Sequence, residues 1–248
     1  MVGHIRLGRL PKTLRWQAVI GLLESVPDDV PAIARATVVA ADTRLRELAR
    51  DPSLVHCFWL LTRLAAASRE PDFAAALGAL GLTPSGETAL AFVAHVSDRV
   101  RGDLARYPES GPFSELASLA LRRALSETIG QHGRSLFGSS LEDVQHAFRS
   151  HSTPARFGDL AQRFFIDREL SNHVGADHAL SGIDASRTFT TELDVYTRQS
   201  ARIMEEFAAS WYSKHNWETH GQISREEAQG FVAIALRKLR MELTRTEL

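Results

Sequence analysis

The chain contains one cysteine, Cys57, among its 248 residues. One cysteine cannot form an intramolecular disulfide or a multi-cysteine metal site, and its scarcity fits a reducing compartment. Cys57 lies in the apolar run Leu-Val-His-Cys-Phe-Trp-Leu-Leu. We therefore expect it to be a small buried side chain and not a nucleophile.

Long apolar runs are also missing. The longest stretches, around 54–61 and 18–23, are far shorter than the roughly 18 to 20 apolar residues that a transmembrane helix needs. The N-terminus has no continuous apolar segment followed by small residues, as a secretory signal would have. These absences predict a protein with no membrane contact and a cytoplasmic location.

Neither sign of charge predominates. The 29 Lys and Arg residues nearly balance the 30 Asp and Glu residues, for a formal net charge of -1. Only Lys12, Lys214 and Lys238 are lysines, which together with the alanine-rich composition is typical of a GC-rich bacterial gene. A nearly neutral chain lacks the overall basic charge that characterises most nucleic-acid-binding domains.

The sequence also lacks the common catalytic motifs. There is no Gly-x-x-x-x-Gly-Lys phosphate loop, no Gly-x-Gly-x-x-Gly turn, no Gly-x-Ser-x-Gly elbow and no His-Glu-x-x-His metal motif. P-loop nucleotide hydrolysis, Rossmann-type redox chemistry and common serine hydrolysis therefore lose support. No cofactor is predicted.

Helical signals recur along the whole chain. Apolar residues three and four apart form single faces, as at Leu90, Val93 and Val96, and no strand-like alternation is sustained. Asp29 and Asp51 stand directly before segments with a proline in the first turn, as at helix N-termini. We predict helices at 11–25, 30–50, 52–68, 71–80, 86–107, 113–131, 140–150, 154–173, 190–214 and 225–245. The predicted fold is an all-α, irregular multi-helix bundle of about ten helices, with 54–67 as its central helix.

The segment 171–190 interrupts the helical pattern for longer than most loops in compact domains. We therefore divide the chain into a main helical domain (1–172), a long loop (173–189) and a C-terminal helical hairpin (190–248). The hairpin either packs on the same core or forms a separate unit.

One candidate metal site falls at this loop. Glu169 and His173 are four residues apart and share a face if the helix continues, and Asp177 and His178 follow. The alternative, which we favour, is a helix C-terminus where a cationic imidazole is stabilised and Gly175 serves as the cap.

Residues 216–227 resemble an EF-hand loop at three positions, Gly221, Ile223 and Glu227. The match covers about twelve residues and fails at the first ligand positions, because His220 is a poor calcium ligand. We favour a simpler interpretation in which Ser224 and Glu227 form a capping box at the start of a helix.

Two segments are candidate partner-binding surfaces. The basic N-terminus carries Arg6, Arg9 and Lys12, which could contact an acidic protein face or, less favoured, nucleic acid; the alternative is that this segment packs on the core. Tyr212 and Trp217 lie off the helical stripe that contains Phe207 and Trp211, so we expect the stripe in the core and judge a partner surface and the core equally plausible for the other two.

Two functional hypotheses follow. The first, and preferred, is a helical adaptor or scaffold subunit of a bacterial cytosolic multiprotein complex, with protein partners. The second is a metal-dependent enzyme whose site gathers Glu169, His173, Asp177 and His178. Whether the chain is an enzyme stays open at this point.

Overall fold

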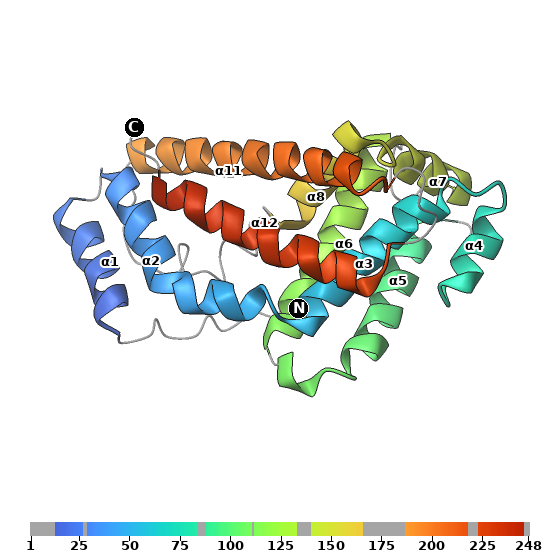
Figure 1. The fold of residues 1–248 in the computed structure, drawn as a ribbon, viewed down its shortest axis with the longest axis horizontal. Helices are drawn as coiled ribbons and strands as arrows, with labels where there is room; N and C mark the ends of the chain where they lie inside the picture. The colour runs from blue at the N-terminus through green and yellow to red at the C-terminus, as the bar shows by residue number, and fades with distance from the viewer. Residues whose placement is uncertain are drawn as a thin grey trace.

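The computed structural model describes residues 13–26, 29–83, 88–110, 112–132, 140–165, 187–217 and 223–245. Within these ranges the chain is helical and has no strand, so the predicted all-α fold is confirmed (Figure 1). The elements, with the labels of Figure 1, are α1 (Leu14–Ser25), α2 (Val30–Leu48), α3 (Pro52–Ala67), α4 (Phe73–Ala79), α5 (Ala89–Leu104), the 3₁₀ helix η1 (Pro108–Ser110), α6 (Pro112–His132), α7 (Leu141–Ser150), α8 (Pro154–Phe165), α11 (Arg187–Lys214) and α12 (Arg225–Arg245).

Short polar side chains start most of these helices. The carboxylate of Asp51 accepts hydrogen bonds from the backbone N–H groups of Ser53 and Leu54 at 3.0 Å, and Pro52 occupies the first helical position of α3. Ser140 and Asp143 form a reciprocal capping box at α7. These side chains satisfy N–H groups that have no partner within the helix, so local sequence sets where each helix begins.

Three predicted helix starts are corrected. The helix predicted from residue 11 begins at Leu14, where Thr13 is the cap. The segment from residue 71 becomes helical only at Phe73, because the side chain of Asp72 caps the helix by accepting from Ala75 N at 2.9 Å. The helix predicted from residue 86 begins at Ala89, where Thr88 is the cap. In each case the helix begins directly after an Asp or Thr whose side chain caps it.

The core surrounds α3, as predicted. Twelve of its sixteen residues are buried, and α3 packs against α4, α5, α6, α7 and α12. Cys57 is fully buried within it, and burial raises the pKa of its thiol far above the usual value. The ring of Phe58 stacks on Phe231 of α12, with centroids 4.7 Å apart, which ties the first half of the chain to the last helix.

Described residues of both C-terminal helices belong to this core. Residues of α11 and α12, including Met204, Ala208 and Phe231, belong to the same buried cluster as α3 and α6. In Figure 1, α11 lies along the top of the view, from above α2 to α8, with α12 beside it. α11 begins at Arg187, three residues before the predicted start, so part of the predicted 173–189 loop is helical.

The helices α1 and α2 extend from one end of the bundle (Figure 1). They pack on each other, and α2 also packs on α12, where Arg240 donates to Asp42 at 2.7 Å. No helix in the described ranges is long and apolar enough to cross a membrane.

Candidate functional site

Most of the residues predicted to form sites lie outside the described ranges. These are the candidate metal ligands Glu169, His173, Asp177 and His178 and the basic residues Arg6, Arg9 and Lys12. Among the residues that the structure does describe, no three or more His, Cys, Asp or Glu side chains gather in a way that could hold a metal ion.

Tyr212 and Trp217 are core residues, so the structure selects the core from the two positions that the sequence left equally plausible. Their exposed fractions are 3% and 1%. The Tyr212 hydroxyl donates to Ser152 O at 2.6 Å, and the Trp217 ring packs edge-on against Phe157 with centroids 5.4 Å apart. Trp217 lies in the turn after α11, beyond the last helical residue. The helical periodicity of α11 therefore could not predict that this side chain is buried.

The converse holds for the two aromatic residues expected in the core. Phe207 and Trp211 are only partly buried, and they pack against the edge of the buried cluster. Trp211 stacks on His215, with ring centroids 4.0 Å apart. These two side chains therefore form the boundary between core and surface on α11.

The corner before α12 follows the capping interpretation. Ser224 N donates to the Glu227 carboxylate at 2.8 Å, and Glu227 N donates to Ser224 Oγ at 3.1 Å. This reciprocal pair is a capping box. Residues 218–222 of the EF-hand-like segment lie outside the described ranges.

Two buried histidines pair with aspartates inside the bundle, and neither pair could be recognised from residue spacing. His56 on α3 is 3% exposed, and its Nε2 lies 3.3 Å from Asp103 Oδ2 on α5, without the alignment of a hydrogen bond. Burial lowers the pKa of His56 to about 4, the charge of Arg225 acts in the same direction, and Asp103 opposes the shift. The ring is therefore neutral at pH 7 and packs among Trp59 and Tyr107 as a core residue.

The second pair links α7 to α8. His151 is fully buried; its Nδ1 lies 2.8 Å from Ala147 O and its Nε2 3.1 Å from Asp159 Oδ2. Asp159 also accepts from Arg163 Nη2 at 2.7 Å, and Arg163 donates to Gln131 on α6. Burial raises the pKa of Asp159, but the hydrogen bonds from His151 and Arg163 outweigh it and hold the value at about 2. This network connects α6, α8 and the C-terminal end of α7, and we interpret it as structural.

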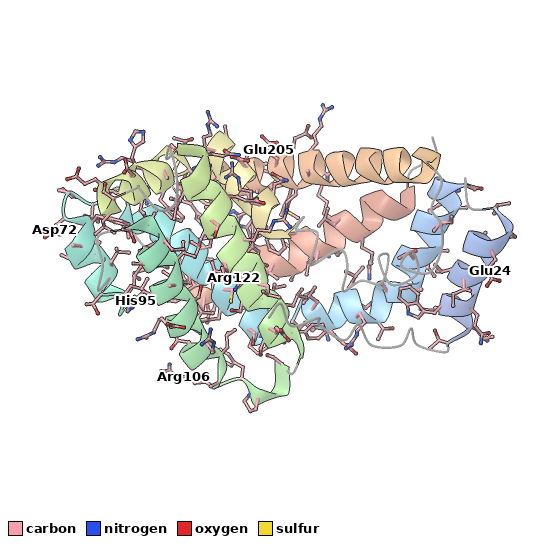
Figure 2. The ribbon with its side chains drawn as sticks, turned by 180° about the vertical axis from the view of Figure 1, so that it is seen from behind. Glu24, Asp72, His95, Arg106, Arg122 and Glu205 are labelled. Carbon is pink, nitrogen blue, oxygen red and sulfur yellow. The ribbon has the colours of Figure 1, made fainter. Side chains whose placement is uncertain are left out.

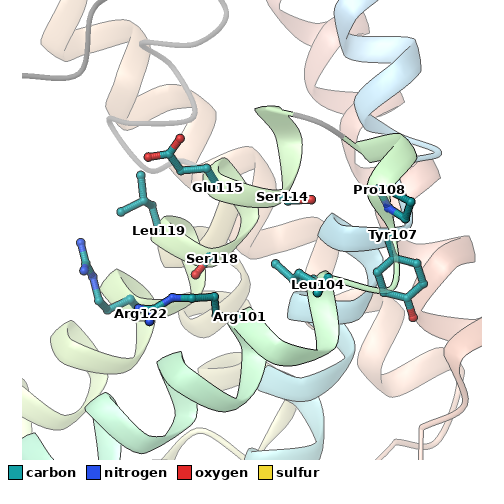
Figure 3. A pocket seen from close by; sticks show the side chains of 10 residues that line it. Arg101, Leu104, Tyr107, Pro108, Ser114, Glu115, Ser118, Leu119 and Arg122 are labelled. Atoms are coloured by element: carbon teal, nitrogen blue, oxygen red, sulfur yellow. The ribbon is translucent and has the colours of Figure 1, made fainter.

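A pocket of about 490 Å³ opens at the surface between α5, η1 and α6. Its size is within the range of ligand-binding clefts. Figure 3 shows Arg101 and Arg122 at one end and Tyr107 and Pro108 at the other. The remaining described lining residues are small, apolar or acidic: Leu104, Ala105, Ser114, Glu115, Ser118 and Leu119.

The arginine end of the pocket carries two guanidinium groups, only one of which has an ion-pair partner among the described residues. The Arg122 guanidinium makes no ion pair or hydrogen bond with any described residue. Arg101 Nη1 lies 3.2 Å from Asp98 Oδ1, but both side chains are more than 70% exposed, so solvent screens this pair. Glu115 lines the same pocket and forms no ion pair with either arginine.

The opposite end is apolar and held in place by α12. The Tyr107 hydroxyl accepts a hydrogen bond from Arg225 Nη1 at 2.6 Å, and the Arg225 guanidinium lies over the Trp59 ring, 4.7 Å from its centroid. These contacts restrict the Tyr107 ring that forms the wall beside Leu104. The pocket therefore combines a basic end with a rigid aromatic end.

Arg101 and Arg122 were not singled out by the sequence analysis. They lie 21 positions apart on separate helices, and each is an ordinary exposed arginine in its own helix. Figure 2 shows α5 and α6 next to each other, with Arg122 on α6. Only the packing of these two helices brings both guanidinium groups to one pocket.

Comparison of the chain with protein-family models, with curated proteins and with solved structures gives no significant match.

Proposed function

We propose that the chain is a helical adaptor or scaffold subunit of a bacterial cytosolic multiprotein complex, and that it binds a partner protein through the α5–α6 pocket. One observation carries this proposal: the pocket places two exposed arginines, of which Arg122 has no ion-pair partner among the described residues, near a tyrosine that Arg225 contacts. Arginine and tyrosine are enriched among the residues that dominate the binding energy of protein interfaces.

The chemistry of the pocket favours recognition over catalysis. Its described lining residues include no histidine, cysteine or lysine, and Glu115 is its one carboxylate. General acid–base or nucleophilic catalysis usually requires a positioned pair of such groups. The histidine–aspartate pairs of the bundle lie elsewhere, at buried positions where they join helices.

The experiment is affinity purification of the tagged full chain from its host at physiological salt, with quantitative mass spectrometry of the retained proteins. The pocket variant is Arg101→Glu/Arg122→Glu. The matched control, Arg46→Glu/Arg202→Glu, makes the same change in charge at two exposed arginines outside the pocket. A stoichiometric partner retained by the wild type and the control, and lost from the pocket variant, is the expected result. A chain recovered alone would contradict the proposal.

The metal-dependent enzyme remains the second hypothesis, since its four residues lie outside the described ranges. Elemental analysis of the purified chain separates the two. A stoichiometric transition metal that is lost on His173→Ala would favour the enzyme. The adaptor proposal predicts no such metal in either protein.

A further inference from the structure

We infer that the α5–α6 pocket takes an acidic peptide segment of the partner, with a carboxylate between Arg101 and Arg122 and a neighbouring apolar side chain against Leu104 and Tyr107. This inference rests on the proposed function, because it specifies the partner chemistry of the same site. It follows from the charge and the shape of the two ends of the pocket.

Two guanidinium groups line one end of the pocket, and Glu115 pairs with neither of them. Asp98 pairs with Arg101 at a highly exposed position, whereas the Arg122 guanidinium has no ion-pair partner among the described residues. Guanidinium groups bind carboxylates through paired, charge-assisted hydrogen bonds. Ser118 lines the same pocket and offers a hydroxyl donor to the same anion (Figure 3).

The apolar end of the pocket indicates that the ligand carries an apolar group as well as a negative charge. Leu104, Tyr107 and Pro108 present aliphatic and aromatic surface within the same pocket as the arginines. Tyr107 is held by Arg225, so a ligand that packs on its ring loses little entropy in ordering it. A peptide that places an aliphatic or aromatic residue near Asp or Glu matches both ends.

The surroundings favour a peptide over a nucleic acid. Nucleic-acid sites follow a phosphate backbone with an extended basic track. Here Asp98 lies beside Arg101, Glu115 lines the pocket, and the chain as a whole carries a formal charge of -1. A short segment with one or two carboxylates suits this local positive charge better than a polyanion does.

The first test is selection from a random peptide display library on the immobilised full chain. We expect the wild type and the Arg46→Glu/Arg202→Glu control to enrich sequences with Asp or Glu next to an aliphatic or aromatic residue. We expect Arg101→Glu/Arg122→Glu to lose this enrichment and to prefer Lys or Arg at the same position. Circular dichroism of each variant establishes that the helical fold is intact.

The second test measures the affinity of one selected peptide by fluorescence anisotropy. Arg122→Gln is expected to weaken binding by about tenfold to a hundredfold, because a charge-assisted hydrogen bond is lost. Arg122→Lys keeps the positive charge but loses the planar guanidinium group, so its affinity should lie between those of the wild type and Arg122→Gln. Changing Glu to Gln in the peptide should cause a similar loss in the wild type and little further loss in Arg122→Gln.

The outcomes separate this inference from the proposed function. Enriched peptides without acidic residues, or acidic peptides bound equally by the pocket variant, would overturn the acidic-peptide inference while leaving a protein-binding role intact. Binding of single-stranded RNA or inorganic phosphate at the same arginines, with no peptide enriched, would also overturn it. A chain that enriches no peptide and captures no partner from its host would contradict both.

Discussion

Gly158 on α8 faces the backbone of Glu205 on α11 so closely that a Cβ atom at Gly158 would lie 2.5 Å from the Glu205 carbonyl oxygen. Real Cβ atoms do not approach backbone oxygen to this distance. The absence of a side chain at Gly158 therefore sets the spacing of α8 and α11, the two helices that bring Phe157 and Tyr212 into contact.

Gly158→Ala is expected to lower the free energy of unfolding by about 1 to 3 kcal/mol, because the added methyl group forces the two helices apart. Urea unfolding followed by circular dichroism measures the change. Gly102→Ala is the control, since a Cβ there meets nothing within 4 Å on the exposed face of α5. That substitution should stabilise the chain by about 0.5 to 1 kcal/mol. Equal effects at the two glycines would contradict the close approach.

Trp217→Ala should destabilise the fold by about 3 to 5 kcal/mol, because it empties space between Phe157, Tyr212 and Phe231. Thermal or urea unfolding provides the measurement. Leu14→Ala, at a side chain that is 84% exposed, should change stability by less than about 0.5 kcal/mol. A Trp217→Ala protein of unchanged stability that no longer captured a partner would instead support the partner-surface alternative for this residue.

His56 should make stability depend on pH in a defined window. Its pKa is about 4 in the folded chain against 6.5 for an exposed imidazole, so the unfolded state binds a proton that the folded state does not. Stability should therefore fall as pH decreases from about 6.5 toward 4, by on the order of 1 to 3 kcal/mol.

The measurement is urea unfolding of the wild type and His56→Gln across this range. The variant loses packing at every pH, so the informative quantity is the difference in stability between the two proteins. That difference should shrink as the pH falls. A constant difference would show that His56 does not titrate with a lowered pKa.

Asp159→Asn tests the network with His151 and Arg163. The pKa of Asp159 is about 2 in the folded chain against 3.8 for an exposed aspartate, so its contribution to stability is complete above pH 3.8 and is lost as the pH falls through 2. Because the side chain is 25% exposed, we expect a loss of on the order of 1 to 2 kcal/mol at neutral pH.

Urea unfolding at neutral and acidic pH checks this expectation, and the effect of the substitution should diminish toward pH 2. Asp98→Asn is the control, because Asp98 pairs with Arg101 at a highly exposed position. Its effect should stay within about 0.5 kcal/mol. Similar losses of stability for Asp98→Asn and Asp159→Asn would indicate that burial of the Asp159 network does not increase its contribution to stability.

The sequence by itself determined the fold class and most helix boundaries. Helices start where a side chain can satisfy free backbone N–H groups within the next three residues, as Asp51 and Ser140 do. The nearly all-round apolar character of 54–67 was likewise enough to predict the central helix α3. These features depend on neighbours along the chain, which a sequence displays directly.

Only the tertiary structure decided which side chains meet. Trp217 is apolar enough for either a core or an interface, and the turn after α11 puts it in the core. Arg101 and Arg122 become one basic pocket end because α5 packs on α6. Helical periodicity specifies the face of a helix but not the helix that covers it, and contacts between distant segments depend on how all the faces pack together.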